Sequence, residues 1–167
     1  MRTDGRIAEL IKSAAFGQAI EELRMLEEQR SLNVTELLSK ALALELLDTQ
    51  ESEEEARDRF RAVEAALTAA LALDSDSVEA LLELAHFYYA IKDDATRAKP
   101  LFERALSISR KGMAESAAGV AQCIEELSSP RAAHSYLLGL RQDLLREIDE
   151  KVAPLLEEYE SSMNKAL

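Results

Sequence analysis

Hydrophobic residues recur at helical spacing in the middle of the chain, most clearly between residues 78 and 109. The first half of this stretch has apolar side chains at Leu81, Leu84, Ala85, Tyr88 and Ile91. After the polar run at 92–94, the spacing resumes at Ala98, Leu101, Phe102, Ala105, Leu106 and Ile108. Intervals of three and four residues place such side chains on one face of a helix. The pattern therefore predicts two antiparallel helices joined by a tight turn.

Capping signals predict where several helices begin. A short polar side chain followed three residues later by Glu can close a capping box around the free amides of the first turn. Three pairs have this spacing: Asn33 with Glu36, Ser52 with Glu55, and Asp76 with Glu79. Ser77 is a second predicted acceptor for the free amides at the third of these starts. Ser129 followed by Pro130 predicts a further start, because proline suits the first helical position.

The stretch from 78 to 109 resembles a tetratricopeptide repeat. Residues typical of the family stand in the first helix at Leu81, Leu84, Ala85 and Tyr88, and in the second at Ala98, Phe102, Ala105 and Leu106. The departures are Leu81 where Trp is common, one extra residue in the turn, and Pro100 inside the second helix. Pro100 removes one backbone donor, so the helix is expected either to start late or to bend there.

Weaker copies of this repeat are predicted on both sides. The small residue of the second helix recurs at Ala19, Val63, Ala98 and Ala132, and a large residue follows each four positions later. These intervals lie near the family period of about 34 residues. The resemblance implies an all-α, right-handed superhelix of about four hairpins, forming one domain over residues 1–167. The predicted repeats are 3–30, with its turn near Phe16, then 34–73, 78–109 and 112–141.

A C-terminal helix over 142–164 is predicted to follow the repeats. Its apolar positions are Leu145, Ile148, Val152, Leu155 and Tyr159, at intervals of three and four residues, and Pro154 is expected to kink it. The helix is interpreted as a cap over the last repeat, since a solenoid must cover its terminal apolar face. The alternative is a homodimer seam.

The acidity of the chain excludes several classes of function. The formal net charge is −12, which disfavours nucleic acid and anionic membrane surfaces because both carry phosphate. It reflects either solubility or a basic partner. No stretch has 18 uncharged apolar residues, and the N-terminus has no long apolar region, so we expect neither a membrane span nor a signal peptide. The single cysteine, Cys123, is interpreted as a small buried residue. A cytoplasmic location follows by default.

Catalysis has little support in the sequence. Two histidines, His86 and His134, lie in different predicted repeats, where a lone histidine is more often structural or solvent-facing. There is no Gly-rich phosphate loop, CxxC, HExxH or serine-nucleophile elbow. The glutamate run near residue 53 is interpreted as an acidic helix start. We therefore expect no enzyme activity, no metal and no cofactor.

The resemblance implies a concave groove lined by the first helix of each pair. Its predicted partner-binding residues are Leu38, Leu42, Glu45, Glu79, Leu82, Glu83, His86 and Tyr89. Leu82 and Tyr89 would anchor a helical or extended segment of another protein that carries basic and apolar residues, and Glu45, Glu79 and Glu83 would pair with its Lys or Arg. Family members that clamp acidic chaperone tails place Lys and Asn in this groove, so that ligand is not expected here. The alternatives are a small acidic chaperone or inhibitor dedicated to one client, and a groove covered by the chain's own tail.

Overall fold

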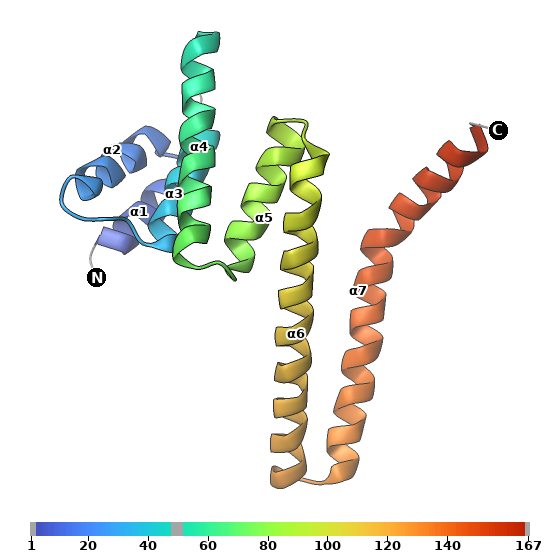
Figure 1. Cartoon of the computed structure of the whole chain (residues 1–167). Coiled ribbons are helices and arrows are strands. Elements are labelled where there is room, and N and C mark those ends of the chain that lie inside the picture. The colour runs from blue at the N-terminus through green and yellow to red at the C-terminus, as the bar shows by residue number, and fades with distance from the viewer. Residues whose placement is uncertain (1–2, 48–51, 166–167) are drawn as a thin grey trace. The chain divides into compact units, whose positions relative to one another are not determined.

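The computed structural model describes residues 3–47 and 52–165, and within these ranges the chain is helical with no strand (Figure 1). The predicted all-α class is therefore confirmed. The elements are α1 (Thr3–Lys12), α2 (Phe16–Glu27), α3 (Val34–Glu45), α4 (Glu53–Leu73), α5 (Val78–His86), the π-helical turn η1 (Phe87–Ile91), α6 (Ala95–Leu127) and α7 (Pro130–Lys165). Residues 48–51, which precede α4, lie outside the described residues.

The chain divides into two compact units, residues 1–110 and residues 111–167. The first unit contains α1 to η1 and the start of α6. The second contains the end of α6 and all of α7. One continuous helix joins the two units, so the prediction of a single domain over 1–167 stays a prediction.

The core of the first unit is organised around α4. This helix makes its most extensive contact with α3 and also packs against α5 (Figure 1). Its buried residues are Val63, Ala66, Leu67 and Ala70, at intervals of three, one and three. These positions form one narrow apolar face, as the pattern of period 3.6 requires. Two alanines in this face allow the neighbouring backbones to approach closely.

Most of the predicted helix starts are confirmed. Asn33 and Glu36 form a capping box at α3, Ser52 and Glu55 form one at α4, and the Ser129 hydroxyl caps the start of α7. The prediction of a capping box between Asp76 and Glu79 was wrong. Ser77 accepts the hydrogen bond from the Ala80 amide instead, because α5 begins one residue later than the box requires.

The first hairpin turns earlier than the predicted position at Phe16. The turn is Ser13–Ala15, and Phe16 is already the first residue of α2. Ala14 has a left-handed conformation with φ 56°, and the amide of Ala15 donates to the carbonyl of Leu10 at 2.8 Å. This is the hydrogen bond that closes a Schellman helix terminus, which stops α1 without glycine or proline.

The extra residue near the central turn is accommodated by the π-helical turn η1. The amide of Lys92 donates to the carbonyl of Phe87 at 3.1 Å, five residues back. A π turn absorbs one additional residue within a helix and rotates the residues that follow. Tyr88 remains buried, whereas Ile91, predicted to face the core, is 45% exposed. The prediction for Ile91 was therefore wrong.

The predicted break between residues 109 and 112 does not exist. Helix α6 continues from Ala95 to Leu127, so the predicted repeats at 78–109 and 112–141 are not separated by a turn. No proline or capping residue stops the helix there; Gly112 alone costs only about 1 kcal/mol, and Lys111 and Glu115 form an i,i+4 pair across the junction. Pro100 lies inside α6 near its start without ending it. Leu106, predicted to be buried, is 60% exposed, one position and about 100° from buried Ala105.

The second unit is a hairpin formed by the end of α6, the turn at Ser128 and Ser129, and α7. The predicted boundary at 141–142 is also absent, because α7 runs unbroken through Pro154 to Lys165. Figure 1 shows its axis bending in the C-terminal part, where Pro154 lies. Four predicted stripe residues, Leu145, Ile148, Val152 and Leu155, are exposed by 40% to 53%. The side chain of Tyr159 lies outside the described residues.

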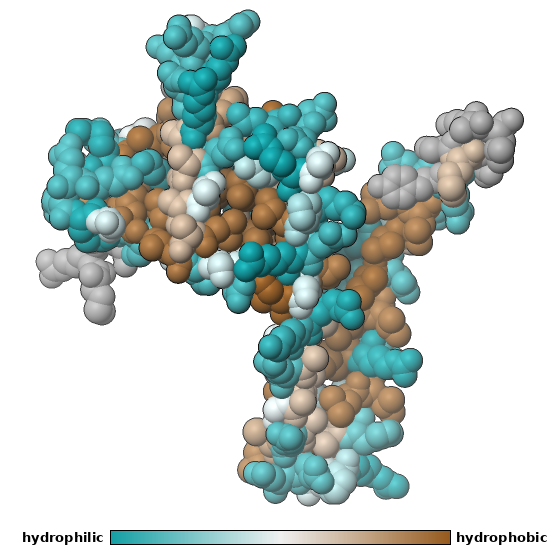
Figure 2. Space-filling model, in the orientation of Figure 1, coloured by the Kyte–Doolittle hydropathy of each residue, from teal (hydrophilic) through white to brown (hydrophobic). Residues whose placement is uncertain are grey.

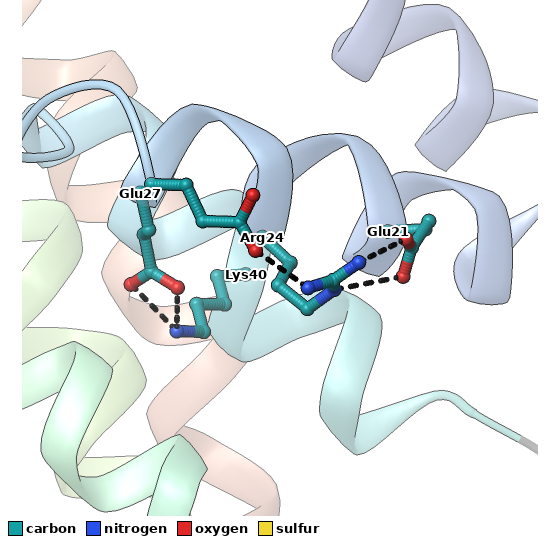
Figure 3. A network of polar contacts seen from close by, with 5 residues as sticks. Glu21, Arg24, Glu27 and Lys40 are labelled. Atoms are coloured by element: carbon teal, nitrogen blue, oxygen red, sulfur yellow. Dashed lines mark hydrogen bonds and ion pairs between the residues drawn. The ribbon is translucent and has the colours of Figure 1, made fainter.

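Polar contacts tie α2 to α3 in the first unit. Glu36 is 1% exposed, accepts from the Asn33 amide at 2.9 Å and pairs with both terminal nitrogens of Arg30. Lys40 of α3 reaches Glu27 of α2 at 2.7 Å, as Figure 3 shows. A buried carboxylate is tolerated only when its oxygens are satisfied, so Glu36 fixes the chain direction between the two helices.

We expect Glu36→Ala to lower the free energy of unfolding by about 2 to 3 kcal/mol, because it removes a cap and an ion pair whose carboxylate is buried and whose guanidinium is half-exposed. Glu55→Ala removes the equivalent residue of an exposed capping box and should cost about 1 kcal/mol or less. Urea unfolding followed by circular dichroism measures both. Equal losses would show that the Arg30 pair adds nothing to the cap.

Candidate functional site

Side chains of α3 and α5 line a small hollow on the first unit. Its volume is ≈ 110 Å³, and its lining residues are Thr35, Leu38, Ser39, Leu42, Glu79 and Glu83. The α3 residues follow intervals of three, one and three, on a face next to that of buried Leu37 and Ala41. Glu79 and Glu83 are separated by four residues, so they lie one above the other on α5. The two helices, which both pack against α4, form the two sides of the hollow. Helix α3 contributes the apolar residues Leu38 and Leu42, and α5 contributes the acidic residues Glu79 and Glu83.

The floor and rim of the hollow differ in character. Leu38 is 9% exposed and belongs to the core, so it forms the floor. Leu42 is 38% exposed and is available to a ligand. Glu79 and Glu83 are exposed carboxylates opposite the leucines. The hollow can thus contact an apolar side chain and a positive charge at the same time.

Glu45, at the end of α3, lies within the electrostatic reach of Glu83. Burial, and secondarily the negative charge of Glu83, raise the pKa of Glu45 above its ordinary range. The ionised form of Glu45 is therefore disfavoured in the isolated chain. A Lys or Arg side chain placed beside Glu45 and Glu83 would remove this penalty, because an opposite charge stabilises the carboxylate.

A second, larger hollow lies between the end of α5 and the start of α6. Its volume is ≈ 450 Å³, and it is lined by His86, Tyr89, Ala95, Ala98, Lys99, Phe102 and Glu103. The ring of His86 meets the ring of Phe102 edge-on, with centroids 5.0 Å apart. Tyr89 is 62% exposed at its margin. Most of this lining is apolar, with Lys99 and Glu103 adding charge at the edge.

The predicted groove residues are distributed over two hollows. Leu38, Leu42, Glu79 and Glu83 meet in the first hollow, and Glu45 adjoins it. His86 and Tyr89 were predicted in the same groove but line the second hollow, and Leu82, which is 36% exposed, lines neither. Glu79 and His86 are seven residues apart, so they lie on nearly the same face of α5 but about 10 Å apart along its axis, beside α3 and α6 respectively.

Sequence reasoning missed a third hollow, between the α2–α3 connection and the end of α4. It has a volume of ≈ 480 Å³ and is lined by Glu27, Arg30, Ser31, Leu32, Leu37, Ala69, Ala72 and Leu73. The only sequence signal is Leu73, which continues the apolar run of α4 beyond the last core position. That signal is weak, because isolated exposed leucines are common on protein surfaces.

The described residues contain neither a cluster of metal-ligating side chains nor a helix able to span a membrane. No group of three or more His, Cys, Asp or Glu side chains among them is arranged to hold a metal ion. None of the described helices has the length and apolar content to cross a membrane. Cys123, predicted to be buried, is exposed on α6, because the helix hairpin of the second unit buries little.

Comparison with protein-family models, with curated proteins and with solved structures found no match to this chain.

The raised pKa of Glu45 has a consequence for stability. The folded chain holds a proton on Glu45 at pH values where the unfolded chain, near the ordinary value of 4.5, has lost it. The unfolded state therefore binds fewer protons there, and stability falls as pH rises through this window. We expect Glu45→Gln to raise the free energy of unfolding at about pH 7 and to change it little below about pH 4. Urea unfolding across this pH range measures the difference.

Glu9→Gln is the matched control, since Glu9 is exposed on α1 in the first unit. It removes the same charge and is expected to leave the pH dependence of unfolding unchanged. A loss of stability in Glu45→Gln at neutral pH would contradict the interpretation, because it would mean that ionised Glu45 has a favourable partner.

Proposed function

We propose that the first unit is a tetratricopeptide-like scaffold that binds a segment of another protein along the exposed faces of α3 and α5, without catalysing a reaction. One observation carries the proposal: four of the predicted groove residues meet in a single hollow, with Glu45 beside it. These residues come from two helices far apart in the sequence. A right-handed superhelix of paired helices is the arrangement that would extend such a groove.

The chemistry of the hollow favours a partner with one basic and one apolar side chain close together. The apolar side chain would contact Leu42 above the floor formed by Leu38. The basic side chain would lie between Glu45 and Glu83. Partly buried pairs of opposite charge give specificity and faster association, while apolar anchors supply most of the affinity.

The second hollow is the natural continuation of this binding surface along α5. Tyr89 offers a large aromatic face, and tyrosine is frequent among residues that dominate binding energy. Leu82 is exposed on α5, between Glu79 and His86 in the sequence. A partner longer than a single turn of helix would contact both hollows and Leu82.

A displayed library of short peptides provides the test. We expect the full chain to select segments with Lys or Arg near an aliphatic or aromatic residue. We expect Glu83→Lys to weaken binding of a selected peptide roughly tenfold or more, because it replaces attraction by repulsion. Isothermal titration calorimetry measures the change, and circular dichroism checks that the variant is folded.

Glu54→Lys is the matched control: it makes the same charge change at an exposed position in the first turn of α4. It should leave the affinity nearly unchanged. Equal weakening by both variants would mean that only overall charge matters, and the groove assignment would then be wrong. Selection of one dominant sequence, in place of a family of related segments, would favour the dedicated chaperone or inhibitor.

A further inference from the structure

The second unit lacks a core of its own. Among its described residues, only Ala121 and Ala133 are buried hydrophobic side chains. Many large apolar residues of the same unit are at least 40% exposed: Met113, Val120, Leu127, Leu137, Leu138, Leu145, Ile148, Val152, Leu155, Leu156 and Met163. Figure 2 shows hydrophobic residues running along α7. A two-helix hairpin cannot bury such a face by itself, and exposed apolar surface of this extent marks an interaction site.

The exposed residues of α7 include a regular stripe. Leu145, Ile148, Val152 and Leu155 follow intervals of three, four and three, the pattern of the a and d positions of a coiled coil. Pro154 occupies a position off this seam, so its ring does not enter the stripe. The four side chains are exposed by 40% to 53%, which leaves each of them available to a second helix.

The stripe is self-complementary in the antiparallel sense. Reversing a copy of α7 about residue 150 sets Leu145 opposite Leu155 and Ile148 opposite Val152. Each a position then meets a d position, which is the layer pairing of an antiparallel coiled coil. The same reversal lets one surface serve both partners, as a two-fold axis requires.

The charges of α7 favour the same orientation. Residues 130–146 carry three basic side chains, Arg131, Arg141 and Arg146, and one acid, Asp143. Residues 147–165 carry Lys151 and Lys165 and a larger set of acids: Glu147, Asp149, Glu150, Glu157, Glu158 and Glu160. Antiparallel pairing about residue 150 sets Arg141 of one copy beside Glu158 and Glu160 of the other and Asp149 beside Lys151, while Asp143 meets Glu157. Parallel pairing would place like charges together.

We propose that a second copy of this chain covers the α7 stripe, so that the protein is a homodimer whose α7 helices pair antiparallel about residue 150. The interface buries Leu145, Ile148, Val152 and Leu155 from both copies. It does not involve the hollow between α3 and α5, so each copy keeps its groove. Failure of this proposal would leave the groove proposal standing, and the reverse also holds.

The mass of the full chain in solution is the first test. Light scattering after size exclusion should give twice the chain mass of 18.5 kDa. Ile148→Asp should give the monomer mass with the same helical circular dichroism, because a buried charge opposes association. The control Leu127→Asp introduces the same charge at an 87% exposed position off the stripe and should remain dimeric. A monomeric wild type, or a dimeric Ile148→Asp, would overturn the proposal.

Disulfide trapping tests the orientation. In a Cys123→Ser background, Asp149→Cys lies beside its own copy near the centre of an antiparallel pair and should cross-link under oxidised glutathione. Leu145→Cys should not cross-link, because ten residues of rise separate it from its copy by about 15 Å. The opposite result, with Leu145→Cys trapped and Asp149→Cys free, would show a parallel dimer and refute the antiparallel arrangement.

Discussion

The packing of α3 and α5 against α4 is the constraint on which the first unit depends. The face of α4 that carries Val63, Ala66, Leu67 and Ala70 is buried because the other two helices cover it. Once they do so, the faces of α3 and α5 that point away from α4 lie next to each other. The hollow between them is thus a by-product of core packing. The charged residues of its lining, Glu79 and Glu83, lie outside the core, whereas Leu38 belongs to both the core and the lining.

A polar network holds the central turn in place beside that core. The Tyr88 hydroxyl donates to Glu64 of α4 at 2.8 Å, and Arg97 of α6 reaches Glu64 at 3.2 Å while lying over the Tyr88 ring. Arg97 also pairs with Asp94, whose pKa it lowers by hydrogen bonding. Burial and the Glu64 contact raise the pKa of Tyr88, so the phenol stays protonated as a donor. The π-helical turn is therefore anchored on both sides, which sets where Tyr89 is displayed.

The two units differ in how far their apolar side chains are buried. The first has a packed core, and burial together with the nearby charge of Glu83 raises the pKa of Glu45. A positive charge from the proposed partner would lower that pKa again, because an opposite charge stabilises the carboxylate. Within the part of the second unit that the structure describes, the buried hydrophobic side chains are Ala121 and Ala133, and the apolar stripe of α7 is exposed. Its exposed side chains are apolar, which is the basis for proposing a second copy of α7 as the partner.

The sequence by itself determined the helical class, the apolar faces of α3, α4 and α5, and the capping boxes at Asn33 and Ser52. These are local properties, because periodicity and end-capping involve residues three or four positions apart. It also identified Leu38, Leu42, Glu79 and Glu83 as neighbours, through the repeat pattern. The continuity of α6, the π turn and the separation of His86 and Tyr89 from the first hollow were decided only by the tertiary structure. Each depends on how one helix packs against another: a single inserted residue or an absent stop signal shifts every later side chain by about 100° per residue, and local pattern does not reveal which face is then covered.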